Sequence, residues 1–159
     1  MEAFDSTLHT PFNMVISGPT QAGKSELTKE VIRRRSEIMN PPVKHVVYCY
    51  GTSSIIFKEK IDAELPDVTM HKGLPESLGD EIGTPYLYIF DDLMQEVSNG
   101  KSKCDKMFTR GSHHNNCSII FITQNFYYDN LRTITTNLKY LVLFKNPSET
   151  QKICKVGMI

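Results

Sequence analysis

The sequence predicts an α/β fold in which a mainly parallel β-sheet is flanked by helices. Three observations support this: five short runs are rich in β-branched and aromatic residues, helical segments separate them, and their apolar character is nearly continuous. Continuous apolar strands are typical of a parallel sheet that is covered on both faces. The expected strands are Phe12–Ser17, Lys44–Tyr50, Tyr86–Phe90, Cys117–Thr123 and Tyr140–Phe144.

Helical segments alternate with these strands, which indicates right-handed crossovers between parallel neighbours. The clearest helix is Glu26–Ile38, which ends before the strong stop signal Asn40-Pro41-Pro42. Gly73–Pro85 is rich in glycine and proline, and we expect it to be the least regular stretch. The other expected helices are Ser54–Ala63, Cys104–His113, Tyr128–Leu138 and a last one from Ser148 onward.

Composition limits the possible classes of protein. The 159 residues predict one domain, residues 1–159, and the last expected helix is short and uncapped, so we expect a fragment or a compact version of a longer domain. Eighteen basic and 18 acidic residues give a net charge of zero, which excludes a generally basic nucleic-acid binder.

The four cysteines form no C-x-x-C pair and indicate reduced thiols in an intracellular protein. No apolar run reaches the length of a membrane span, and the N-terminus does not resemble a signal peptide.

The most informative motif is GPTQAGKS, Gly18–Ser25, which matches G-x-x-x-x-G-K-[ST] between an expected strand and an expected helix. In that context, backbone N–H groups and the helix N-terminus bind a polyphosphate. Lys24 can reach the outer phosphates, and the Ser25 hydroxyl can bind Mg²⁺. The alternative is a chance turn before a helix. The predicted nucleotide-binding residues are Gly18, Pro19, Thr20, Gln21, Ala22, Gly23, Lys24, Ser25 and Glu26.

Two acids end the third expected strand, in the sequence YLYIFDD. An acid at the C-terminal end of such a strand can hold Mg²⁺, and we assign this role to Asp91. Asp92 would then be free to orient or deprotonate an attacking water. The alternative is that both aspartates are solvated and cap the helix that follows from Leu93. The nearby P-loop motif favours the functional interpretation.

The fourth expected strand ends in Thr123-Gln124-Asn125, where Gln124 could sense the γ-phosphate or position water. Ligands of open α/β sheets bind at the C-terminal ends of strands, and Gly18, Asp91 and Gln124 all fall at such ends. The alternative is a polar strand end that binds nothing.

Two sets of arginines allow two interpretations each. Arg110 precedes the fourth strand and either reaches the γ-phosphate of a neighbouring subunit or is a surface arginine; its spacing does not decide between them. Arg33-Arg34-Arg35 closes the first helix, and we interpret it as a solvated helix end in preference to a contact with the DNA backbone.

Three segments together resemble the genome-packaging ATPases of the FtsK/HerA P-loop superfamily, of the type found in nucleocytoplasmic large DNA viruses, virophages and Maverick/Polinton-like elements. The segments are HTPFNMVISGPTQAGKS, YLYIFDDLM and TRGSHHNNCSIIFITQNFYY. The third is the most specific, because an arginine, then histidines and asparagines, then an apolar strand ending in ITQN is not a general P-loop feature. LKYLVLFKNPSE resembles the next strand and turn, so the similarity extends from about His9 to Glu149.

The resemblance implies a RecA-like (ASCE) fold with an extra strand between the P-loop strand and the acidic strand. It implies ATP hydrolysis with Mg²⁺ that drives double-stranded DNA into a preformed capsid. The implied partners are copies of the chain in a homo-oligomeric ring, a pentamer or hexamer, and capsid vertex proteins. The implied location is the viral factory or nucleus of a host cell, or the virion. The residues that match catalytic positions are Lys24, Asp92, Gln124 and Arg110, and those that match metal positions are Ser25 and Asp91.

The chain departs from the family in having Asp92 where glutamate is commoner, and in lacking some strands after Phe144. Two other functions stay open. A superfamily-3 replicative helicase would use Asn125 as its sensor, although the position of Gln124 and the segment TRGSHHNN argue against it. A non-hydrolysing assembly protein would use nucleotide only to order its fold. A GTPase is disfavoured because Lys145-Asn146-Pro147 does not match N-K-x-D.

Overall fold

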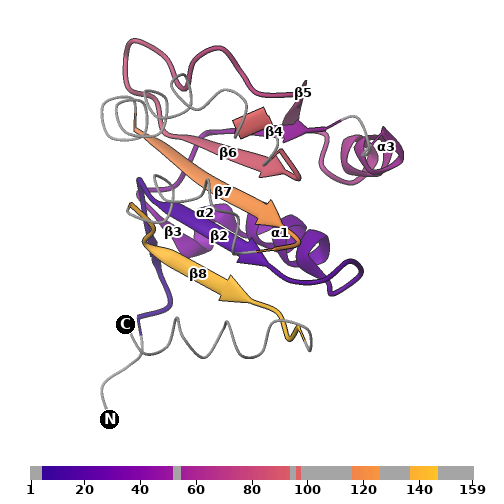
Figure 1. Cartoon of the computed structure of the whole chain (residues 1–159). Coiled ribbons are helices and arrows are strands. Elements are labelled where there is room, and N and C mark those ends of the chain that lie inside the picture. Colours follow the sequence, from indigo (N-terminus) through magenta and orange to yellow (C-terminus); the bar gives the residue numbers. More distant parts are fainter. Residues whose placement is uncertain (1–4, 52–54, 94–95, 98–115, 126–136, 147–159) are drawn as a thin grey trace.

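The computed structural model describes residues 5–51, 55–93, 96–97, 116–125 and 137–146. In these residues a six-stranded sheet, in which all neighbours run parallel, crosses the molecule in the order β5-β4-β6-β7-β2-β8 (Figure 1). The predicted α/β class with a mainly parallel sheet is therefore confirmed. The strands are β2 (Asn13–Ser17), β4 (His45–Tyr50), β5 (Val68–Lys72), β6 (Tyr86–Asp91), β7 (Cys117–Thr123) and β8 (Tyr140–Leu143).

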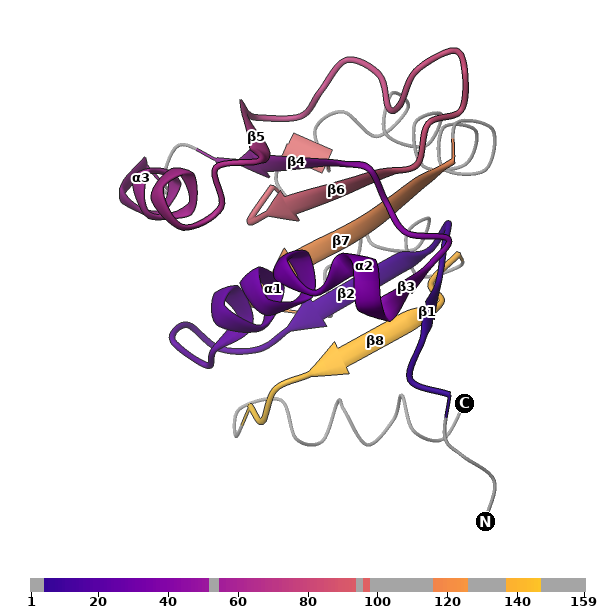
Figure 2. The ribbon, with the colours of Figure 1, turned by 180° about the vertical axis from the view of Figure 1, so that it is seen from behind.

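Two helices, α1 (Lys24–Arg33) and α3 (Ile55–Glu64), pack on one face of this sheet. Ile32 of α1 and Ile61 of α3 are buried in one cluster with side chains of β2, β4 and β6. The short α2 (Arg35–Ile38) continues from α1, as seen from behind in Figure 2. A second, two-stranded parallel sheet joins β1 (Leu8–His9) to β3 (Met39–Asn40). In the described residues, no helix is both long and apolar enough to span a membrane.

The opposite face of the sheet buries a second apolar cluster. Within β6, Leu87 and Ile89 belong to the first cluster, whereas Tyr88 and Phe90 belong to the second. Every residue of β2 and of β7 is buried. Because successive side chains of a strand point to opposite faces, burial on both sides requires an apolar residue at almost every position. This explains why these strands could be recognised in the sequence.

Between the P-loop strand β2 and the acidic strand β6 lies β7. This confirms the extra strand that the resemblance implied. It also has a structural consequence: β7 is hydrogen-bonded to both neighbours, so the C-terminal ends of β2 and β6 are held on either side of it.

The prediction of one continuous helix, Glu26–Ile38, is wrong, because the structure contains two helices, α1 and α2, separated by Arg34. Arg34 has φ −96° and ψ 10°, which is not helical. The guanidinium of Arg35 donates a hydrogen bond to the Ile32 carbonyl oxygen at 2.8 Å and forms an ion pair with Asp67. One of these contacts is local and the other is tertiary, and both occur at a point where the sequence has no glycine or proline. The predicted helix Ser54–Ala63 is present as α3.

The edge strand β5 was not predicted, because only Val68 in it is buried and its other positions are polar or partly exposed. Gly73–Pro85 has no helix or strand, as expected. The predicted helices Cys104–His113 and the one from Ser148 lie outside the described residues, as does Tyr128–Leu138 except at its last two positions.

A buried ion-pair network joins α1 to α3. Lys29 is 1% exposed, and its Nζ lies 2.7 Å from Glu26 Oε1 and 2.8 Å from Glu64 Oε2. Arg33 donates to the same Glu64 oxygen at 2.9 Å. Burial lowers the pKa of Lys29, but the two carboxylates raise it and the net direction is upward. Glu64 therefore stabilises two cations, one of which has little access to water.

We predict that Glu64→Gln lowers the free energy of unfolding by about 1–3 kcal/mol, because it removes one of the two carboxylates that compensate the charge of buried Lys29. Urea denaturation measures the change. The matched control is Glu37→Gln, which breaks an ion pair with Arg34 in which Glu37 is 65% exposed, and should cost less than about 1 kcal/mol. Equal losses in the two variants would contradict the proposed contribution of Glu64.

Candidate functional site

The register of the central strands brings the predicted site residues to one edge of the sheet. Ser17 pairs with Thr123, and Asp91 pairs with Ile122. The chain leaves these strands at neighbouring points, where the Gly18 N–H donates to the Thr123 carbonyl oxygen at 3.2 Å. The Asp92 N–H likewise donates to the Ile122 carbonyl oxygen at 3.1 Å. Backbone pairing thus places the P-loop, the two acids and Gln124 side by side.

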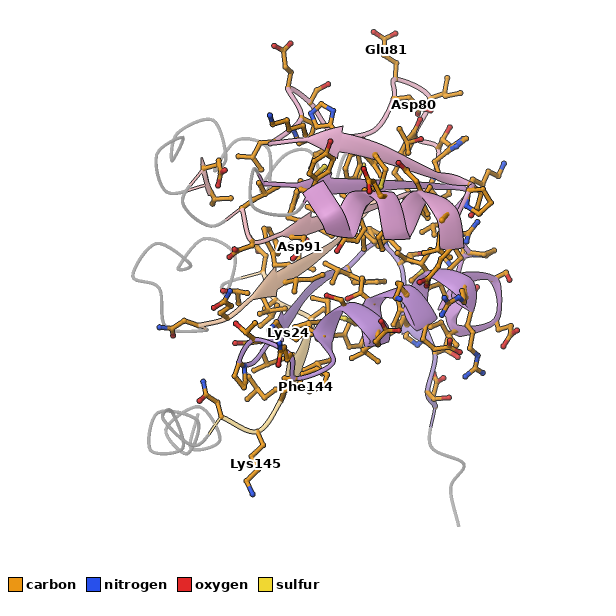
Figure 3. The ribbon with its side chains drawn as sticks, turned by 90° about the vertical axis from the view of Figure 1, so that its right-hand side faces the viewer. Lys24, Asp80, Glu81, Asp91, Phe144 and Lys145 are labelled. Atoms are coloured by element: carbon orange, nitrogen blue, oxygen red, sulfur yellow. The ribbon has the colours of Figure 1, made fainter. Side chains whose placement is uncertain are left out.

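A pocket of about 330 Å³ lies between these strand ends. Seven of the residues that line it were predicted for the site, from the P-loop, the acidic strand end and the sensor strand end. Two of the lining residues, Lys24 and Asp91, are labelled in Figure 3. The lining residues are Thr20, Gln21, Lys24, Ser25, Asp91, Asp92, Ile122, Thr123 and Gln124.

The loop backbone needs glycine at two positions for two different reasons. Gly23 has φ 100°, in the left-handed region that favours glycine, and directly precedes α1. At Gly18 the reason is steric, because a Cβ there would lie 2.5 Å from Cβ of Phe144. Phe144 follows β8 and is held in place by its N–H, which donates to the Ser17 carbonyl oxygen at 2.8 Å. The residue after β8 therefore packs directly against the P-loop.

Lys24 is buried at the start of α1. Its ammonium donates hydrogen bonds to the carbonyl oxygens of Gly18 at 2.6 Å and Pro19 at 2.7 Å. Burial lowers the pKa of Lys24, and the carboxylates of Asp91 and Asp92 oppose this. The loop thus surrounds a cation that faces two carboxylates across the pocket.

Asp91 is the last residue of β6, and one of its carboxylate oxygens accepts a hydrogen bond from the interior of the protein. The hydroxyl of Tyr48, on the neighbouring strand β4, donates to Asp91 Oδ2 at 2.8 Å. Burial raises the pKa of Asp91 and Asp92 adds to this, whereas Tyr48 and Lys24 oppose it. Burial, together with Asp91, also raises the pKa of Tyr48, so Tyr48 keeps its proton and acts as a donor.

Asp92 has φ 54°, a backbone conformation that is uncommon for a residue with a side chain. Such strain, typically about 1–3 kcal/mol, persists where the surrounding structure enforces it and is frequent at functional sites. Here the Asp92 N–H is still bonded to β7, so the chain turns immediately after the sheet ends. Asp91 and Asp92 consequently both line the pocket.

The end of β7 is fixed by Thr123. Its buried hydroxyl donates to the Asn125 carbonyl oxygen at 3.0 Å and accepts from the Asn125 N–H at 3.3 Å. This local turn leaves Gln124 exposed at the pocket.

Two arginine predictions have different outcomes. Arg110 lies outside the described residues. Each residue of the run Arg33-Arg34-Arg35 pairs with a carboxylate. Arg33 pairs with Glu30 and Glu64. Arg34 pairs with Glu37, and Arg35 pairs with Asp67. This favours the interpretation of a helix end over a DNA contact.

Sequence reasoning missed Tyr48 and Phe144. Both belong to apolar runs, where an aromatic residue indicates core packing. Their contacts with Asp91 and Gly18 depend on strand order, which no local pattern contains.

Comparison with solved structures supports the fold assignment. The cytoplasmic domain of EssC matches with a TM-score of 0.61 and 16% identity over 89% of this chain. A chain of the E. coli MS115-1 HORMA:CdnC:Trip13 complex matches with a TM-score of 0.50 and 15% identity over 95%. This chain covers 33% of the first structure and 50% of the second. No protein-family model and no curated protein matches the sequence. These similarities show a shared α/β fold, and the G-x-x-x-x-G-K-[ST] loop of this chain lies at the pocket formed by its strand ends.

We predict that Gly18→Ala lowers the free energy of unfolding by about 1–3 kcal/mol, because the new methyl group overlaps Phe144. Thermal or urea unfolding measures the effect. Gly51→Ala is the control, since its Cβ would lie 3.6 Å from the nearest atom, an ordinary contact. If Gly18→Ala is no more destabilising than the control, the close packing of Phe144 on the loop is wrong.

Proposed function

We propose that this protein is a Mg²⁺-dependent ATPase motor that moves double-stranded DNA into a viral capsid. The observation that carries the ATPase part is the convergence of four groups in one pocket. These are the P-loop with Lys24, the hydroxyl-bearing Ser25, the adjacent acids Asp91 and Asp92, and the polar Gln124. A binding site for phosphate alone would not require the two acids and the glutamine opposite the loop.

The residues present fit a nucleoside triphosphate with bound Mg²⁺. The loop N–H groups and Lys24 would hold the phosphates, and oxygen atoms of Ser25 and Asp91 would hold the cation. The described residues contain no group of three or more His, Cys, Asp or Glu side chains that could bind a metal unaided. Phosphate and water oxygens would therefore complete its coordination. Bound Mg²⁺ neutralises charge on the phosphates.

Asp92 and Gln124 would act on the attacking water. Both side chains line the pocket without belonging to the P-loop. The Asp92 carboxylate would accept a hydrogen bond, and then a proton, from the water, while the Gln124 amide would orient the water toward the γ-phosphate. In the proposal Arg110 comes from a neighbouring subunit and stabilises charge that develops during transfer.

The packaging part of the proposal rests on the resemblance of TRGSHHNNCSIIFITQNFYY and the two other segments to genome-packaging ATPases. The fold similarity to the cytoplasmic domain of EssC supports the ATPase superfamily only. Because this chain covers a third of that domain, ring formation, DNA contact and capsid docking are proposals for the whole protein. The net charge of zero requires that DNA contact come from a local surface.

Steady-state ATP hydrolysis, measured with and without double-stranded DNA over a range of protein concentrations, tests this function. The proposal predicts turnover that rises with both DNA and protein concentration, because each site needs a neighbour. ATP binding without turnover under all conditions would contradict the motor and support the nucleotide-binding assembly protein. Separation of strands on a forked duplex would support the helicase instead.

We predict that Asp92→Asn reduces kcat by about 10²–10⁴-fold and leaves ATP affinity nearly unchanged, because only proton acceptance by the side chain is lost. Single-turnover hydrolysis and equilibrium binding separate the two effects. Glu96→Gln, which alters a nearby exposed acid that does not line the pocket, is the control. Full turnover in Asp92→Asn would remove Asp92 from the reaction.

A further inference from the structure

We propose that Tyr48 is a positioning residue for Mg²⁺ binding: its buried hydroxyl holds one oxygen of Asp91, so that the carboxylate presents its other oxygen to the pocket. This inference rests on the proposed nucleotide site and concerns a residue on a strand that contributes nothing to the lining of the pocket.

The geometry begins with strand register. Tyr48 of β4 is paired with Ile89 of β6, and Asp91 lies two residues further along β6. Ile89 and Asp91 project from the same face of the sheet, because side chains alternate along a strand. Tyr48 and Ile89 are packed in the same apolar cluster. The tyrosine ring spans the remaining distance and brings its hydroxyl to 2.8 Å from Asp91 Oδ2.

The surroundings of the two groups differ in a way that suits this role. Tyr48 is 0% exposed, whereas Asp91 is partly exposed and lines the pocket. The hydrogen bond therefore approaches Asp91 from the interior and cannot be replaced by water from the pocket side. Because the donor is neutral, it fixes the carboxylate without cancelling the negative charge that attracts a cation. A lysine or arginine at position 48 would orient Asp91 but weaken that attraction.

A buried tyrosine hydroxyl needs a hydrogen-bond partner in any protein, so the contact could also serve stability alone. The two roles predict different results. A purely structural contact affects folding and all ligand binding alike. A positioning contact affects the Mg²⁺-dependent part of nucleotide binding, since partners of metal ligands typically alter metal affinity by about 10–100-fold when they are removed.

The test is Tyr48→Phe, which keeps the ring and removes only the hydroxyl. ATP binding is measured by calorimetry in excess EDTA and then during titration with Mg²⁺. We expect binding in EDTA to match the wild type, and the Mg²⁺ concentration for half-maximal enhancement to rise about 10–100-fold. The matched control is Tyr88→Phe, which removes another buried hydroxyl, one that accepts from the Gly79 N–H at 2.9 Å on the opposite face. Its Mg²⁺ dependence should equal that of the wild type.

A double-mutant cycle identifies the residue through which Tyr48 acts. In an Asp91→Asn background, Tyr48→Phe should cause no further change in Mg²⁺ dependence, because the carboxylate that it positions is gone. Equal effects of Tyr48→Phe in both backgrounds, or an unchanged Mg²⁺ dependence in the single variant, would overturn the inference and leave the proposed ATPase intact. A wild-type protein that binds no ATP with Mg²⁺ would overturn both.

A measurement on the unmodified protein applies if Tyr48→Phe does not fold. With ¹³C-labelled tyrosine, the ring resonances of Tyr48 should shift when Mg²⁺ is added to the ATP-bound protein, whereas those of Tyr88 should not. Unshifted Tyr48 resonances at saturating Mg²⁺ would contradict the positioning role.

Discussion

Parallel pairing of β6, β7 and β2 is the constraint on which the candidate site depends. The pairs Ser17 with Thr123 and Asp91 with Ile122 align the ends of three strands that are far apart in the sequence. Once they are aligned, the residues that follow each strand have little freedom in where they lie. Gly18 and Asp92 even continue the backbone hydrogen bonding to β7 before the chain turns away. A slip of register by one residue would turn side chains to the opposite face and disperse the site.

Buried charges and uncommon backbone angles at the site lower the free energy of unfolding, and the contacts of neighbouring residues and strands offset this loss. Lys24 and Asp91 are charged groups with limited access to water, and each shifts the pKa of the other toward its ionised form. Gln21 and Asp92 adopt positive φ angles, which are uncommon for residues with side chains. The loops that carry these residues follow strands that are buried on both faces. Every residue of β2 and of β7 is buried. Rigid strands thus hold loops that would not keep this conformation alone.

Much of the fold was predictable because two-sided burial leaves a strong sequence signal. The placement of the P-loop, Asp91 and Gln124 around one pocket was predictable because each of them follows or ends a parallel strand. The signal fails at the sheet edge, where β5 is largely polar, and at Arg34, where contacts of Arg35 end a helix without a glycine or proline. Tyr48 could not be found from sequence, because a tyrosine in an apolar strand is most often a core residue. Its role depends on which strand lies next to β6, which only the topology reveals.

The central claim is that the aligned strand ends form a triphosphate site around Lys24. Calorimetric titration of ATP into the wild-type protein and into Lys24→Ala tests it most directly. Loss of the ammonium should weaken binding by about 10–100-fold, as expected for charge-assisted hydrogen bonds to phosphate. Lys145→Ala is the control, since Lys145 is exposed and points away from the pocket in Figure 3. Equal ATP affinity in wild type and Lys24→Ala, or no binding by the wild type, would contradict the account.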